Sequence, residues 1–244
     1  MPENYTRQNA KRVVPTELNS AHTIVSDEDE DRAPNFLVLP SGDGANRVLL
    51  AGVVTDIQDV GTDNEYFRME CNDVAGGRFF AYAGQYQPEA KATMKALSAP
   101  AFVSVIGKPR TYETDEGDVR VSIRPEVIQT IDQSEYLSLL AEAADHTIER
   151  LTGERGSDRF RGMADTMHDD ETRRDIYEAA VETLEEVHEA VAGEEAEDDT
   201  LSREDLEAKE YSELRSLASE FEDISGNAAA DTLIDELEGQ PVPA

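Results

Sequence analysis

The chain has 244 residues and a net charge of −32, from 54 Asp and Glu against 22 Lys and Arg. Its apolar runs are shorter than the ~18 residues that cross a bilayer, and it starts without an apolar signal segment, so a cytoplasmic protein is expected. One cysteine excludes an intramolecular disulfide framework and a cysteine-based zinc site. With only four scattered histidines as well, no metal and no cofactor are expected.

Strong acidity with few aromatic residues is typical of disordered chains. It is also expected of a folded halophilic protein, because a Debye length of about 3 Å near 1 M salt screens the repulsion between surface carboxylates. Strand and helix patterns persist through the acidic background of this chain. They favour the folded, salt-adapted interpretation.

The charge is unevenly distributed along the chain. Residues 1–46 form an N-terminal extension of net charge −4, whereas residues 132–244 carry −25. Residues 47–131 between them carry only −3 and hold 8 of the 15 aromatic residues. If part of this molecule meets a polyanion, this middle block is the best candidate.

The middle block predicts five strands and one helix. The alternation of apolar and polar residues gives strands over 47–57, 65–71, 78–84, 101–108 and 119–125, and Pro88 opens a helix over 88–97. Gly52 and Gly107 suit strands that bend around a small barrel, and Pro125 is expected to end the last strand. The order strand-strand-strand-helix-strand-strand predicts an α+β fold with a mainly β core, namely a five-stranded OB-fold barrel over 47–131.

The outward faces of these strands suggest a binding site for single-stranded nucleic acid, which stacks on aromatic rings in a positive groove. The alternative is that several of the rings only fill the barrel. A one-residue error of register would expose Phe79 and bury Phe80. The predicted site residues are Tyr66, Arg68, Arg78, Phe80, Tyr82, Lys108, Arg110, Arg120 and Arg124.

Several segments of the sequence resemble a known family. AYAGQYQPEA (81–90), PAFVSVIGKPRTY (100–112) and VSIRPEVI (121–128) are similar to haloarchaeal proteins associated with replication protein A, and the likeness covers about residues 5–155. The resemblance implies an OB-fold accessory subunit in a hetero-oligomer with replication protein A subunits and single-stranded DNA. Larger replication protein A homologues often contain a zinc finger, for which this chain lacks the cysteines.

Residues 132–192 predict amphipathic helices over 134–151 and about 172–192, with a loop and a short helix between them. An apolar stripe on the first helix serves either as core or, as implied by the replication protein A family, in which a helix after the barrel assembles subunits, as a partner interface. In the N-terminal extension, Arg7, Lys11 and Arg12 suit a solvated face or a phosphate contact. The predicted partner-interface residues are Leu137, Leu140, Ala144, Ile148 and Leu151.

Residues 193–204 read as an acidic linker, and residues 205–240 resemble a helix-extended-helix module of the SAP type, through ELRSLA, SGN and TLIDEL. Such modules use basic residues around the second helix to bind duplex DNA. Here these positions hold Ala228, Ala229, Asp231 and Asp235. A protein-contact or degenerate module is therefore favoured over a DNA-binding one.

The sequence lacks a phosphate-binding loop, a dinucleotide-binding glycine motif and a serine nucleophile elbow, so no enzymatic activity is expected. The leading hypothesis is binding of single-stranded DNA in replication or repair. The alternative is an interaction subunit that assembles with the DNA-binding protein without touching DNA itself. The net charge favours this alternative.

Overall fold

A computed structural model describes residues 9–26, 34–198, 201, 203–221, 224, 228–238 and 240. The chain divides into two compact units, Met1–Val187 and His188–Ala244. No helix among the described residues is both long and apolar enough to cross a membrane.

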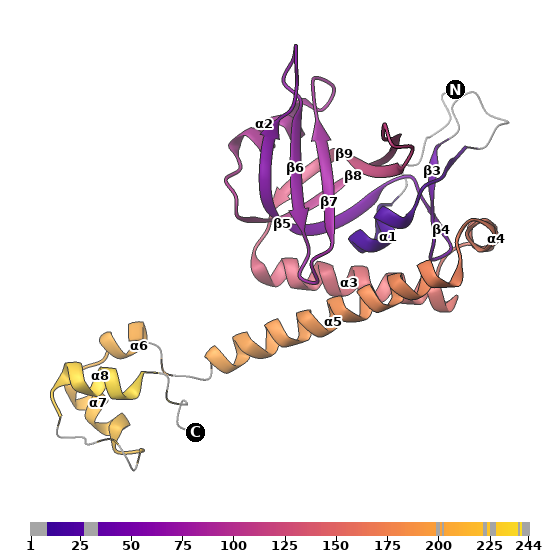
Figure 1. Ribbon diagram of the computed structural model, residues 1–244. Coiled ribbons are helices and arrows are strands. Elements are labelled where there is room, and N and C mark those ends of the chain that lie inside the picture. The colour runs from indigo at the N-terminus through magenta and orange to yellow at the C-terminus, as the bar shows by residue number, and fades with distance from the viewer. Residues whose placement is uncertain are drawn as a thin grey trace, which may run out of the picture. The chain divides into compact units, whose positions relative to one another are not determined.

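The middle of the chain folds into a closed five-stranded barrel (Figure 1). Its strands are β5 (Val48–Asp59), β6 (Phe67–Asn72), β7 (Arg78–Ala83), β8 (Ala101–Glu113) and β9 (Val119–Thr130). They follow one another in the order β5-β6-β7-β9-β8, and an antiparallel pairing of β5 with β8 closes the barrel. Helix α2 (Pro88–Ala96) connects β7 to β8, and β7 pairs with β9 in parallel. This topology is the predicted OB fold.

Strand β9 is longer than the sequence predicted. Pro125 does not end the strand, which continues to Thr130. The register between β8 and β9 shifts at Gly107, which lies opposite Pro125, and such irregularities tolerate a proline inside a sheet. A Cβ atom on Gly107 would lie 2.5 Å from the carbonyl oxygen of Arg124, so the close approach requires glycine.

The barrel interior is filled by the inward positions of the alternating strands. Met69, Cys71, Phe79 and Ile123 are fully buried in one apolar cluster. Burying one such apolar side chain contributes roughly 1.5–3 kcal/mol. Burial also raises the pKa of the Cys71 thiol to about 12, so this cysteine stays protonated and packs as an apolar side chain.

The N-terminal segment belongs to the same core. Strand β1 (Lys11–Arg12) pairs with β5, and helix α1 (Pro15–Ser20) follows. Strands β2 (Ile24–Val25), β3 (Phe36–Leu39) and β4 (Asp43–Ala45) form a second, three-stranded sheet. Leu18 of α1 and Leu37 of β3 are buried in the same apolar cluster as the barrel residues. The N-terminal segment is therefore an integral part of the fold.

Two basic residues of this segment form ion pairs with acidic residues of the same chain. Lys11 pairs with Asp43 at 2.5 Å, and Arg12 pairs with Glu142 at 2.5 Å. Both cations are partly shielded from solvent, so the solvated-face interpretation holds only in part. Arg7 lies outside the described residues.

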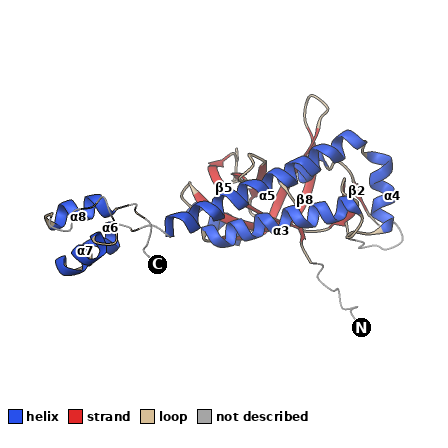
Figure 2. Cartoon of the chain, turned by 90° about the horizontal axis from the view of Figure 1, so that it is seen from below, coloured by secondary structure: helices blue, strands red, loops and turns tan. Residues whose placement is uncertain are grey.

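Three helices follow the barrel, α3 (Gln133–Thr152), α4 (Asp158–Met167) and α5 (Asp170–Asp198). The Asp132 side chain caps α3 by accepting from the Glu135 N–H at 2.8 Å, and Gly153 ends it with φ 88°. Figure 2 shows α3 and the first part of α5 side by side against the barrel, joined by a small cluster around Ala144 and Ala180. Helix α5 continues to Asp198, into the segment predicted as a linker.

The apolar stripe on α3 is not available as a partner interface in this structure. Leu137, Leu140 and Ala144 are buried within the chain, and Ile148 and Leu151 are half-buried. The barrel strands and α5 cover this stripe. This packing is expected, because an amphipathic helix on a globular protein buries its apolar face against the core. The core interpretation of the stripe therefore applies.

The C-terminal unit has an apolar cluster of its own. Helices α6 (Arg203–Glu207), α7 (Tyr211–Ala218) and α8 (Ala230–Leu237) bury Leu206, Leu214, Leu233 and Leu237 together. Both helices of the proposed SAP-like module are present, whereas its SGN turn (225–227) lies outside the described residues. The SAP resemblance itself stays a prediction.

Candidate nucleic-acid interface

The outer face of β6 and β7 carries the five site residues predicted on these two strands. Phe79 is fully buried, whereas Phe80 is half-buried and Arg78 is exposed. The antiparallel register pairs Arg68 with Tyr82 and Glu70 with Phe80, so these side chains share one side of the sheet. The predicted face assignment is confirmed, and the alternative register that exposes Phe79 is wrong.

The rings on this face form two platforms. Tyr66 and Tyr82 stack on each other with ring centroids 5.7 Å apart and planes inclined by 23°. The guanidinium groups of Arg68 and Arg78 each lie 5.8 Å from the ring centroid of Phe80. Flat rings and guanidinium planes are the groups on which unpaired bases stack.

Both arginines on this face are also paired with acids. Arg68 contacts Asp56 at 3.3 Å, and Arg78 contacts Glu70 at 3.1 Å. Exposed ion pairs of this kind contribute only ~0–1 kcal/mol and weaken with salt, so phosphate can compete for these guanidinium groups. The pairs hold the arginines over Phe80 while lowering the net positive charge.

A second group of cations lies on the outer side of β8 and β9. Lys108 is paired in register with Arg124, and Arg110 lies two residues farther along β8. No ion pair joins these three cations to a carboxylate among the described residues, although the charge of Glu126, which pairs with Arg47, acts on both Lys108 and Arg124. Burial and the nearby Arg47 lower the pKa of Lys108, as expected where cations gather. Arg120 is largely exposed, with Asp118 at 3.9 Å.

The barrel topology joins the two groups into one band. Ala81 of β7 pairs in parallel with Ile123 of β9. The next residue on each strand, Tyr82 and Arg124, therefore falls on the outer side of neighbouring strands. All nine predicted site residues thus lie on the same outer surface of β6, β7, β9 and β8, which we call the outer band.

Four further residues, which the sequence prediction missed, adjoin the outer band. Tyr112 and Tyr86 are exposed, and 83% of the surface of the Tyr86 residue is accessible to solvent. Tyr112 continues the alternation of Lys108 and Arg110, so the pattern itself could have identified it. Asn19 and His22 come from the N-terminal segment, in which the sequence suggested a phosphate contact only for Arg7, Lys11 and Arg12.

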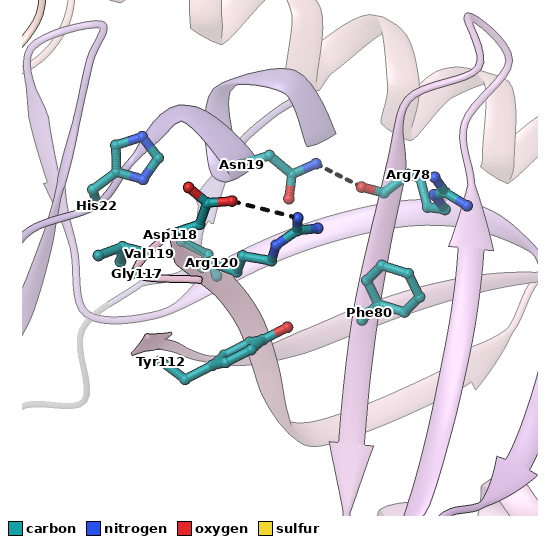
Figure 3. A pocket seen from close by; sticks show the side chains of 10 residues that line it. Asn19, His22, Arg78, Phe80, Tyr112, Gly117, Asp118, Val119 and Arg120 are labelled. Atoms are coloured by element: carbon teal, nitrogen blue, oxygen red, sulfur yellow. Dashed lines mark hydrogen bonds and ion pairs between the residues drawn. The ribbon is translucent and has the colours of Figure 1, made fainter. Parts of the chain in front are cut away.

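Two hollows flank the outer band. The larger, of about 690 Å³, lies between the α1 region, β7 and the β8–β9 hairpin (Figure 3). The smaller, of about 530 Å³, contains Tyr86 and Arg124. In the larger hollow the Asn19 amide donates to the Arg78 carbonyl at 2.7 Å, which ties the N-terminal segment to β7. We call the larger hollow the α1 pocket.

The described residues include no group of three or more His, Cys, Asp or Glu side chains placed to hold a metal ion. The outer band offers stacking surfaces, hydrogen bonds and positive charge. These groups can bind and orient a ligand.

Neither the protein-family models nor the curated proteins give a match to this sequence. Among solved structures, the chain is similar to OBody AM2EP06 bound to hen egg-white lysozyme, with 20% identity, 39% of this chain and 87% of that chain covered, and a TM-score of 0.32. It is also similar to the S. pombe Stn1-ten1 complex, with 10% identity, coverage of 66% and 100%, and a TM-score of 0.42. A third similar structure is asparaginyl-tRNA synthetase from Pyrococcus horikoshii, with 22% identity and a TM-score of 0.31. The match covers 46% of this chain and 28% of that chain. All three likenesses concern the fold alone.

Proposed function

We propose that this protein binds single-stranded DNA, largely independently of sequence, along the outer band of its OB-fold barrel. One observation carries the proposal: stacked or guanidinium-flanked rings and a group of cations share one outer face of a strongly acidic chain. Rings that served only the core would be buried like Phe79.

The composition of the outer band suits binding in concentrated salt. Affinity that rests on phosphate contacts falls steeply as salt rises. Stacking on Tyr66, Phe80 and Tyr82 contributes roughly 1–3 kcal/mol per base and depends less on salt. A binder that works in molar salt should therefore rely on rings, with cations such as Arg110 and Arg124 setting the path of the backbone.

Fluorescence anisotropy of a labelled oligo-dT at about 2 M salt tests the proposal on the full chain. We expect binding by the wild type and a loss of at least tenfold in affinity for Phe80→Ala combined with Tyr82→Ala, because two stacking surfaces disappear. Both side chains are only partly buried, so the barrel should survive their removal.

Tyr177→Ala provides the matched control. Tyr177 is a tyrosine on α5 that is 46% exposed and does not belong to the outer band, and its removal should leave affinity unchanged. Equal binding by the wild type and the double variant would contradict the proposal.

A second candidate function is an interaction subunit whose barrel assembles with the DNA-binding protein. It is favoured by the net charge of −32 and by the acids that pair with Arg68 and Arg78. In that case oligo-dT binds only to the complex, and removal of Phe80 and Tyr82 has no effect on it.

The family resemblance supports a more specific role. We propose that the chain acts without catalysis as an accessory subunit of a replication protein A complex, in replication or repair, and that its acidity reflects a host with a salty cytoplasm. Co-purification of the tagged chain from its host tests this directly. A single-strand-binding protein in stoichiometric amount is expected, and its absence would contradict the accessory role.

A further inference from the structure

The α1 pocket is continuous with the outer band but is built partly from outside the barrel. Arg78 and Phe80 of β7 and Tyr112 of β8 line it together with Arg120. The side of the pocket that faces away from the outer band is lined by Asn19, which lies in α1, and by His22, which follows α1. A strand that follows the outer band therefore meets a walled hollow at this end.

The pocket has surfaces on which one base can stack. Phe80 is half-buried and Tyr112 is 44% exposed, so both present ring surface to the hollow. Figure 3 shows the two rings on opposite strands below the Asn19 amide. At about 690 Å³ the pocket lies in the range of small-ligand sites, ample for a nucleobase.

The orientation of the Asn19 amide is determined by its partner. Its Nδ2 donates to the Arg78 carbonyl at 2.7 Å, and a carbonyl accepts only from an N–H. The Oδ1 atom therefore faces the pocket as an acceptor, as Figure 3 shows. An acceptor at this point favours a ligand that donates a hydrogen bond, and an exocyclic amino group projects farther from the ring toward it than the N3–H of thymine.

We infer that the α1 pocket takes one base of the bound strand and prefers a base with an exocyclic amino group, namely cytosine, adenine or guanine, over thymine. The amino group donates to Asn19 Oδ1 while the base lies against Phe80 and Tyr112. This inference rests on the proposed function, because a strand along the outer band delivers the base. It adds a local base preference to otherwise sequence-independent binding.

Anisotropy at about 2 M salt with three dT 12-mers tests the inference on the full chain. The first is unmodified, the second carries one central cytosine, and the third carries 2-pyrimidinone there, which is cytosine without its amino group. We expect the cytosine to raise affinity about three- to tenfold, the gain from one hydrogen bond, and 2-pyrimidinone to abolish that gain.

Asn19→Ala should remove the cytosine preference, so that the cytosine-containing and the unmodified oligonucleotide bind this variant with equal affinity. Asn46→Ala is the matched control, because the Asn46 amide also donates to a backbone carbonyl, that of Asn35 at 2.7 Å, and does not line the pocket. It should keep the preference.

Equal affinity for all three oligonucleotides would overturn the pocket inference alone. A cytosine preference that survives Asn19→Ala would overturn it as well. The absence of binding to every oligonucleotide would instead contradict the proposed function.

Discussion

At the scale of single residues, one buried carboxylate is set apart by its surroundings. Asp73 begins the β6–β7 turn, is only 8% exposed, and accepts a hydrogen bond from the Gly77 N–H at 2.5 Å. Burial raises its pKa to about 6, against the lowering effect of the backbone amides of Gly77 and Ala75. Its charged form is therefore disfavoured in the folded state.

Asp73→Asn should stabilise the protein above pH 6 and have little effect below pH 4. The folded-state pKa exceeds the unfolded value, so stability from protonated Asp73 is present below the unfolded pKa and is lost as pH rises through about 6. Asparagine stays neutral and still accepts from Gly77, so we expect a gain of about 1–3 kcal/mol at pH 7.5.

Chemical unfolding followed by tyrosine fluorescence at pH 4 and 7.5 measures this difference. Seven of the eight tyrosines precede residue 188, so the signal reports mainly on the barrel unit. An advantage of the variant that does not change with pH would contradict the assignment.

At the scale of elements, a buried polar network joins α1, the turn after β3 and α3. Glu17 and Arg150 are both buried and pair at 2.6 Å, while Ser41 and Thr147 complete their hydrogen bonds. This network holds α1 beside the barrel. It thereby places Asn19, two residues after Glu17, at the α1 pocket.

Replacing one partner of the Glu17–Arg150 pair should lower the free energy of unfolding far more than replacing both partners. Arg150→Met leaves a buried, uncompensated Glu17 carboxylate, and we expect a loss of about 3–5 kcal/mol. Combining Arg150→Met with Glu17→Met replaces the pair by apolar side chains and should restore most of that loss. The same fluorescence-monitored unfolding measures both, and a double variant as unstable as the single one would contradict this account of the network.

The sequence predicted the barrel elements well but not this network. Alternation identifies strands because one face of each is buried, and it therefore places Phe79 inside the barrel and Phe80 outside, as the structure has them. Glu17 and Arg150 are separated by 133 positions, and among so many carboxylates nothing in the sequence shows that Glu17 is buried. The contribution of Asn19 to the α1 pocket escaped prediction for the same reason, since it depends on tertiary contact.

At the scale of the whole molecule, the acidity and the fold have to be reconciled. The described cations are mostly paired with acids, yet 54 acids face only 22 bases. Uncompensated repulsion destabilises a compact state at low salt and is screened at high salt.

The apolar stripe on α3 illustrates the limit of the sequence at this scale, because periodicity shows that a face is apolar and not what covers it.

Thermal melting at 0.1 M and 2 M KCl should show this dependence. We expect the melting temperature to rise by at least 10 °C at the higher concentration, because screening relieves repulsion throughout the surface. Circular dichroism at 222 nm follows both units. A melting temperature indifferent to salt would count against the halophilic interpretation.

The central claim is that a single strand lies along the outer band. Photocrosslinking of the full chain to a 5-iododeoxyuridine oligonucleotide, followed by peptide mapping, tests where the strand lies. Our account predicts crosslinks at Tyr66, Phe80, Tyr82 and Tyr112. Crosslinks confined to residues 188–244, or binding without any crosslink in the barrel, would contradict it.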